Sequence, residues 1–246
     1  MYKQEVIKPY SKEGDKREQI ETMFNKIAHS YDTLNHTLSL GIDKIWRKKA
    51  IDFLRKNRNS TDSVLDIATG TGDFAILAYK KLKPSIIIGC DISEGMMSIG
   101  RQKVEKMGLS DKITFQNEDC SHLSFNDNSF DAVISAFALR NFQDLDQCLS
   151  EMHRVLAIGG NISIIDLCSP TTFPMKYLFY IYKKVVMPIL GKLISKDNKA
   201  YTYLPDSMDA VPQAEEMRQI IEKAGFKHTK FKRLLLGVCI LYTGEK

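Results

Sequence analysis

Glycines and carboxylates that could hold a small charged molecule stand close together between residues 64 and 75 of this 246-residue chain. Gly70 and Gly72, with Thr71 between them, follow an apolar run that reads as a strand, and a helical pattern comes next. Glycines at such a place let the backbone turn tightly and approach a ligand closely. Asp66 and Asp73 bracket the turn with negative charge. The pattern therefore predicts a ligand-binding turn after a first strand.

Two kinds of cofactor fit the glycine turn. Residues 70–75 satisfy the G-x-G-x-x-A spacing of dinucleotide sites, and Asp91 follows where such a fold needs a carboxylate. A dinucleotide, however, would bring a pyrophosphate dianion between Asp66 and Asp73. S-adenosylmethionine carries a sulfonium and an ammonium instead, and at about 4 Å each carboxylate–cation pair contributes up to roughly 4 kcal/mol before desolvation. Charge therefore favours S-adenosylmethionine; a nicotinamide oxidoreductase and a cofactor-binding protein without catalysis are the alternatives.

Side chains at the ends of the next three expected strands fit the same cofactor. Asp91 can accept hydrogen bonds from both ribose hydroxyls, and Asp119, beside Cys120, can take the adenine amino group. Ala136 can line the methionine portion, since parallel sheets bind ligands at their carboxyl ends. With Asp-x-x-x-Gly-x-Gly, the set resembles the cofactor site of class I methyltransferases. The expected cofactor site consists of Asp66, Gly70, Thr71, Gly72, Asp91, Asp119, Cys120 and Ala136.

The elements that must position these residues alternate between strands and helices in the middle of the chain. Such alternation predicts βαβ units and a parallel sheet covered on both faces. We therefore expect an α/β, Rossmann-like fold of the class I S-adenosylmethionine-dependent methyltransferase type, with a seven-stranded, mostly parallel sheet. Expected strands are 63–67, 85–90, 113–117, 130–136 and 161–167, and expected helices are 73–82, 94–107 and 144–156.

The flanking segments complete one expected domain of 246 residues. Two helices, about 17–32 and 43–57, should precede the sheet, and a helix over 213–224 should lead into a reversed edge hairpin of strands 227–232 and 237–243. The expected parts of the domain are N-terminal helices (1–60), a cofactor-binding core (61–168), a helical lid insertion (169–212), and a C-terminal helix with the strand hairpin (213–246).

Composition and charge exclude several classes of protein. Hydrophobic residues make up 43% and charged residues 26%, which is typical of a globular chain. The net charge of +5 is spread along the sequence, so we expect no nucleic-acid partner. The five cysteines are scattered without metal-site or disulfide spacing, so we expect no metal. With no apolar signal segment or long apolar run, the expected location is the cytoplasm.

Further motifs give the chain a specific resemblance, which covers about residue 20 to the end. The most particular are Tyr31-Asp32 and Trp46-Arg47 in the N-terminal helices and Leu139-Arg140-Asn141 after the fourth strand. The chain resembles the ubiquinone/menaquinone biosynthesis C-methyltransferase family. It departs from the family at some positions, including Asp166-Leu167-Cys168, where the family usually has Glu-Phe-Ser.

The resemblance implies methyl transfer from S-adenosylmethionine to a ring carbon of a polyprenylated hydroquinone. Demethylmenaquinol is the favoured acceptor; a ubiquinone precursor or another small molecule is the alternative. Arg140 would stabilise the phenolate or orient a water, because a guanidinium stays protonated and cannot be a simple base. Asn141 would hydrogen-bond the second ring oxygen or merely cap a turn. His122 and His29 are proton-acceptor candidates by residue type alone.

The segment 171–194 is unusually apolar and aromatic, with interspersed lysines. One interpretation is a lid packed over the substrate pocket. The other is an interfacial element through which a polyprenyl tail enters from a membrane. The lid is the favoured interpretation. Peripheral contact with the inner face of the cell membrane is compatible with it as a secondary role. A homodimer is the default expectation for the oligomeric state.

Overall fold

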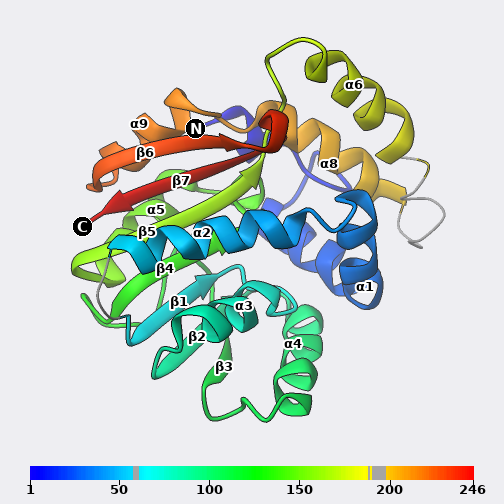
Figure 1. Ribbon diagram of the computed structural model, residues 1–246. Helices are drawn as coiled ribbons and strands as arrows, with labels where there is room; N and C mark the ends of the chain where they lie inside the picture. Colours follow the sequence, from blue (N-terminus) through cyan, green and yellow to red (C-terminus); the bar gives the residue numbers. More distant parts are fainter. Residues whose placement is uncertain (58–60, 188, 190–197) are drawn as a thin grey trace.

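A seven-stranded sheet forms the centre of the computed structural model, which describes residues 1–57, 61–187, 189 and 198–246 (Figure 1). The strand order is β3-β2-β1-β4-β5-β7-β6. β1 to β5 pair in parallel, and β7 runs antiparallel to both of its neighbours, β5 and β6. The expected mostly parallel sheet with a reversed hairpin is therefore confirmed. The strands are β1 (Ser63–Ile67), β2 (Ile86–Asp91), β3 (Ile113–Asn117), β4 (Phe130–Ala136), β5 (Leu156–Leu167), β6 (Lys227–Leu234) and β7 (Cys239–Glu245).

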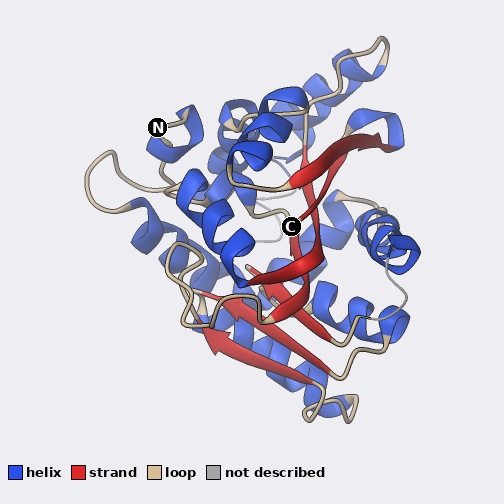
Figure 2. Cartoon of the chain, turned by 90° about the vertical axis from the view of Figure 1, so that its left-hand side faces the viewer, coloured by secondary structure: helices blue, strands red, loops and turns tan. Residues whose placement is uncertain are grey.

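Helices cover both faces of the sheet, as Figure 2 shows. Apolar residues of α2 and α3 pack on one face with the side chains of β1 and β4, and α5 and α9 cover the other. Burial on both faces explains why the central strands are mainly apolar rather than strictly alternating. The helices are α1 (Lys16–Leu38), α2 (Asp43–Asn57), α3 (Asp73–Leu82), α4 (Glu94–Lys106), α5 (Leu145–Val155), α6 (Met175–Ile181), α8 (Asn198–Ala210) and α9 (Glu215–Lys223).

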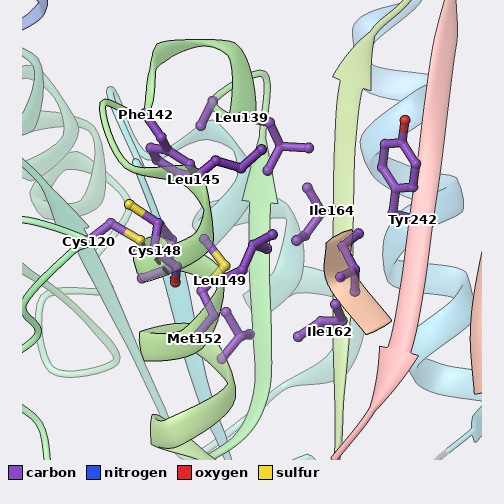
Figure 3. Close-up of a cluster of buried hydrophobic side chains, with 14 of the residues drawn as sticks. Cys120, Leu139, Phe142, Leu145, Cys148, Leu149, Met152, Ile162, Ile164 and Tyr242 are labelled. Atoms are coloured by element: carbon purple, nitrogen blue, oxygen red, sulfur yellow. Dashed lines mark hydrogen bonds between the residues drawn. The ribbon is translucent and has the colours of Figure 1, made fainter. Parts of the chain in front are cut away.

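The packing of α5 shows how one face of the core is built (Figure 3). Leu149 and Met152 of the helix lie against Ile162 and Ile164 of β5, and all four are fully buried. Asp144 begins the helix by accepting a hydrogen bond from the backbone N–H of Gln147 at 2.9 Å. α5 is thus fixed both by its apolar stripe and by its first turn.

Two expected boundaries were wrong by more than two residues. α1 continues to Leu38 instead of ending near residue 32, because Leu34 lies on its buried face and keeps the next turns packed. β5 begins at Leu156 rather than residue 161, because Leu156 already pairs with Phe130 before a register shift, after which Asn161 pairs with Ala132. The longer α1 matters for the site, since it extends along the ends of the parallel strands and packs against α4.

The expected lid segment contains α6, a π-helical turn (Tyr182–Val186) and α8. Residues 188 and 190–194 of the expected 171–194 stretch lie outside the described residues. In Figure 1, α6 lies at the top of the molecule, away from the sheet. None of the helices in the described ranges has the length and apolar character needed to cross a membrane.

Gly72 should be required by packing as much as by backbone conformation. Its φ is +78°, and a Cβ there would lie 2.8 Å from the Phe115 ring. We expect Gly72→Ala to lower the free energy of unfolding by about 2–4 kcal/mol, from left-handed strain plus overpacking. Gly108→Ala is the matched control, because its φ is +66° with nothing within 4 Å, so only the strain of about 1 kcal/mol remains. Urea unfolding measures both variants, and equal losses would contradict the packing role.

Candidate active site

A cavity of about 390 Å³ opens at the carboxyl ends of β1, β2 and β4. Five residues of the expected cofactor site line it together. They are Gly70, Asp91, Asp119, Cys120 and Ala136. Residues from α1 close its other side, among them Phe24 and Tyr31. We call this space the cofactor cavity.

Asp91 ties the second strand to the glycine turn. Its carboxylate accepts one hydrogen bond from the backbone N–H of Gly70 and another from that of Ser93, both at 2.8 Å. Burial raises the pKa of Asp91 to about 6, against these two hydrogen bonds. The carboxylate is therefore held in place at the cavity wall.

Asp66 and Thr71 line a smaller hollow that adjoins the cofactor cavity and shares Gly70 and Ala136 with it. Asp66 is buried, accepts a hydrogen bond from the Thr69 hydroxyl at 2.7 Å, and has its pKa raised to about 7 by burial. The Thr71 hydroxyl donates to Asp32 at 2.6 Å. Gly72 lines neither space.

Asp119 has a partner that the sequence alone did not indicate. Arg17, near the start of α1, lies with Nη1 2.7 Å from the carboxylate, and the backbone N–H of Ser121 donates to the other oxygen at 2.9 Å. The pKa of Asp119 lies below its usual value because these donors outweigh its burial. Arg17 also lines the cofactor cavity, so Asp119 and Arg17 form one polar wall. The neighbouring Cys120 is buried and adds an apolar surface.

A second cavity of about 110 Å³ lies beside the first and is mainly apolar. We call it the acceptor cavity. Its lining includes Met23, Ile27, Leu34, Leu38, Trp46, Phe137, Leu167, Phe179, Met187, Leu204 and Val238. Polar groups interrupt the lining at a few places, where Arg140, Asn141, Ser39 and Asp43 contribute. A mostly apolar pocket with a few directed polar groups is typical of a site for an amphipathic small molecule.

Arg140 lies in a short 3₁₀ turn (Leu139–Asn141) directly after β4. Its side chain is buried and pairs with Asp166 of β5, Nη1 to Oδ1, at 2.6 Å. Burial raises the pKa of Asp166, and the Arg140 guanidinium opposes that rise. The ammonium of Lys16 holds the same turn by donating to the carbonyls of Arg140 and Phe142, at 3.0 and 3.3 Å. Asp166 thus holds the side chain of Arg140, and Lys16 holds the backbone of its turn.

Two buried N–H donors of the acceptor cavity have no hydrogen-bond partner in the described part of the chain. They are Nε of Arg140 and Nε1 of Trp46. An unpaired buried donor costs about 1–3 kcal/mol, so such groups are rare without a ligand to satisfy them. Both residues line the cavity. A ligand with two oxygen acceptors would satisfy them.

Four residues line both cavities and therefore mark where they meet. These are Phe24, Tyr31, Phe137 and Asn141. The Asn141 side chain is oriented by Tyr203, whose hydroxyl donates to its Oδ1 at 3.2 Å. A group transferred between molecules in the two cavities would pass this boundary. Arg140 and Asn141, the expected catalytic residues, both lie next to it.

The histidines expected by residue type lie elsewhere. His122 lines the cofactor cavity beside Ser121, and His29 is exposed on α1. Instead, His36 lies with Nδ1 3.1 Å from Asp43, a carboxylate of the acceptor cavity. Sequence reasoning missed this pair because a turn between α1 and α2 brings the two residues together.

The strand order, the reversed β7 and the cofactor cavity at the carboxyl edge define a class I methyltransferase fold. A solved phosphoethanolamine N-methyltransferase 2 of Haemonchus contortus, in complex with S-adenosyl-L-methionine, has the same fold with a TM-score of 0.59 and 16% identity. The match covers 81% of this chain and 52% of that one. The chain belongs to the ubiE/COQ5 methyltransferase family, whose model matches residues 12–246.

Curated relatives agree with this assignment. A demethylmenaquinone methyltransferase of Bacteroides fragilis is 58% identical over all of this chain and 99% of its own length. A ubiquinone/menaquinone biosynthesis C-methyltransferase UbiE of Geobacter sulfurreducens is 40% identical over 94% of this chain and 90% of its own length. The resemblance that the motifs suggested is therefore confirmed.

The buried pair of Arg140 and Asp166 should matter strongly for stability. We expect Asp166→Asn to lower the free energy of unfolding by about 3 kcal/mol, because it leaves a buried guanidinium without its counter-charge. Asp127→Asn is the control, since Asp127 pairs with Arg154 while its own side chain is 68% exposed, and exposed pairs contribute about 1 kcal/mol or less. Chemical denaturation of both variants gives the comparison, and similar small losses would contradict the role of Asp166.

Proposed function

We propose that the protein transfers a methyl group from S-adenosylmethionine to a ring carbon of a polyprenylated hydroquinone, converting demethylmenaquinol to menaquinol. The observation that carries the proposal is an apolar cavity with two unpartnered buried N–H donors beside a cavity walled by carboxylates. The head group of a hydroquinone is an apolar ring with two oxygens. The names and high identity of the relatives support the same reaction.

The cofactor cavity suits a cation. Asp91 at its wall and Asp66 in the adjoining hollow are carboxylates whose pKa values are raised by burial, so a sulfonium or ammonium nearby would relieve the cost of ionising them. We assign Asp91 to the ribose hydroxyls, and Asp119 with Cys120 to the adenine. Asp66, Gly70, Thr71 and Ala136 are assigned to the methionine end. Gly72 shapes the turn behind them through its contact with Phe115.

The chemistry requires an electron-rich ring carbon held about 3–3.5 Å from the methyl. Loss of a hydroxyl proton supplies that electron density. Arg140 stabilises the resulting phenolate from its buried position, where a fixed positive charge acts in a low dielectric. Asn141 holds the ring at the boundary between the two cavities. Trp46 offers a further N–H donor to the second oxygen.

The naphthoquinol is favoured over a benzoquinol by the relative that is 58% identical and named for demethylmenaquinone. The UbiE name of the 40% identical relative covers both quinones. Short-chain demethylmenaquinol and the corresponding benzoquinol, supplied to the same enzyme preparation, distinguish the two acceptors by their kcat/KM.

Arg140→Lys should lower kcat for methyl transfer about 100-fold while affinity for S-adenosylmethionine stays unchanged. Lysine keeps a positive charge opposite Asp166 but loses the planar fork and the Nε donor. Product formation from short-chain demethylmenaquinol is followed by mass spectrometry, and cofactor affinity by calorimetry. Arg101→Lys on the exposed face of α4 is the control. Full turnover in the Arg140 variant would contradict its assigned role.

We propose further that the described part of the segment 169–212 forms a lid over the acceptor cavity and that α6 contacts a membrane surface. Phe179, Tyr182 and Met187 of this region line the cavity, whereas the opposite side chains are exposed. The exposed apolar group consists of Phe173, Tyr177, Leu178, Tyr180, Ile181, Val185 and Ile189. The exposed charges between them, Lys176 and Lys184, are both basic. Such a surface suits an anionic leaflet in which a polyprenyl chain is dissolved.

A triple variant, Tyr177→Ser, Ile181→Ser and Val185→Ser, should lose binding to vesicles of phosphatidylglycerol and phosphatidylcholine in a flotation assay. Its KM should rise for a long-chain acceptor in vesicles and stay constant for a short-chain acceptor in solution. Ile158→Ser, at an equally apolar position that is 83% exposed on β5, is the control. Vesicle binding that the triple variant retains would refute the membrane contact.

A further inference from the structure

A cluster of six charged or titratable side chains joins the acceptor cavity to the glycine turn. Four elements contribute to it. Its members are Asp32 and His36 of α1, Asp43 and Arg47 of α2, Asp73 of α3 and Lys103 of α4. We call it the α1–α4 charge cluster. Asp32 and Arg47 belong to motifs of the family, but the roles assigned to Arg140 and Asn141 do not account for the cluster.

Asp43 is the member that reaches the acceptor. Its side chain is 2% exposed and lines the acceptor cavity. The Ser39 hydroxyl donates to its Oδ1 at 2.7 Å, and Arg47 pairs with its Oδ2. These partners and His36 keep the pKa of Asp43 below its usual value despite its burial. Asp43 is therefore an ionised carboxylate at the edge of an apolar pocket.

His36 lies between two carboxylates. Nδ1 is 3.1 Å from Asp43, and Nε2 is 3.6 Å from Asp73. A neutral imidazole has one protonated nitrogen, so one of its lone pairs must face a carboxylate. An imidazolium presents an N–H to each. With its side chain 31% exposed, the ring can also exchange a proton with solvent.

With a neutral His36, the charges of the cluster add up to one negative charge, which one further proton would compensate. Asp32, Asp43 and Asp73 are three carboxylates, and Arg47 and Lys103 are two cations, so a neutral His36 leaves one negative charge uncompensated. Lys103 is shared, with Nζ 2.5 Å from Asp32 and 2.7 Å from Asp73. Protonation of the imidazole brings the sum of these charges to zero.

Methylation of a hydroquinone ring releases one proton overall. The new carbon–carbon bond forms as the methyl–sulfur bond breaks, and its electron pair stays on sulfur as a neutral thioether. The ring hydroxyl loses a proton beforehand, the methylated carbon loses its hydrogen as a proton afterwards, and the ring oxygen takes one proton back. One proton must therefore leave the buried site in each turnover.

We propose that Asp43 and His36 take up this proton: the acceptor hydroxyl gives it to the Asp43 carboxylate, and His36 receives it at Nδ1 and releases it to solvent. Asp43 is then a catalytic residue that touches the acceptor, and His36 acts through it. Arg140 stabilises the phenolate that remains. This inference rests on the proposed methyl transfer, and it names the proton acceptor of that reaction.

The test compares His36→Ala and His36→Gln with His29→Ala, a control on the exposed face of the same helix. Methyl transfer to short-chain demethylmenaquinol is measured in single turnover from pH 5.5 to 9. Both His36 variants should be about 100-fold slower, as expected for loss of a proton acceptor, with unchanged affinity for S-adenosylmethionine. Their rates should also depend on pH differently from the wild-type rate, because the proton acceptor is missing.

Added imidazole should restore the rate of His36→Ala in proportion to the concentration of its neutral form, and should do nothing for His36→Gln, which fills the space. Asp43→Asn should be as slow as His36→Ala and insensitive to imidazole. A wild-type rate in either His36 variant, or slow rates without rescue or change of pH profile, would overturn the proposal. If the wild type itself makes no product, the proposed function fails instead.

Discussion

Buried negative charge at the carboxyl edge of the sheet is the constraint on which the rest of the site depends. Asp66 and Asp91 lie where solvation is poor, and burial raises the pKa of each toward neutrality. Ionising such groups is costly unless a positive charge is close. Arg47 opposes the rise for Asp66 only in part. The edge is therefore suited to a ligand that brings a positive charge to it, whereas a dinucleotide would bring a pyrophosphate dianion.

The acceptor side uses the opposite arrangement, a buried cation held ready for a developing anion. Arg140 is paired with Asp166, and its turn is fixed by Lys16, whose pKa burial lowers to about 7. Tyr203 orients the neighbouring Asn141. Because Tyr31 and Phe137 wall both cavities, the donor and the acceptor meet at one place. The carboxylates then stabilise the cationic methyl donor, and the Arg140 guanidinium stabilises the phenolate that forms on the acceptor.

Sequence reasoning was most successful where local pattern and burial agree. The bounds of β1, β3 and β4 were predicted correctly, because β-branched, aromatic and other apolar residues form short runs there. The start of β5 and the end of α1 were wrong, since a bulge and the burial of Leu34 depend on tertiary packing. Likewise, the motif identified Arg140 but not its partner Asp166. No sequence pattern indicated two further pairs, Arg17 with Asp119 and His36 with Asp43. The partners in these pairs lie on elements far apart in the chain or on either side of a turn. Spacing alone carries no signal for such contacts.

Calorimetric titration with S-adenosylmethionine, repeated between pH 5.5 and 8.5 in buffers of different ionisation enthalpy, tests the central claim most directly. With free-protein pKa values of about 7 for Asp66 and about 6 for Asp91, both carboxyls are partly protonated at the acid end. A bound cation lowers these pKa values, so binding should release protons below pH 7, and affinity should rise with pH and level off above about 8. Asp66→Asn should reduce the proton release. Saturable binding of NADH, or affinity for S-adenosylmethionine that is independent of pH with no proton released, would contradict the account.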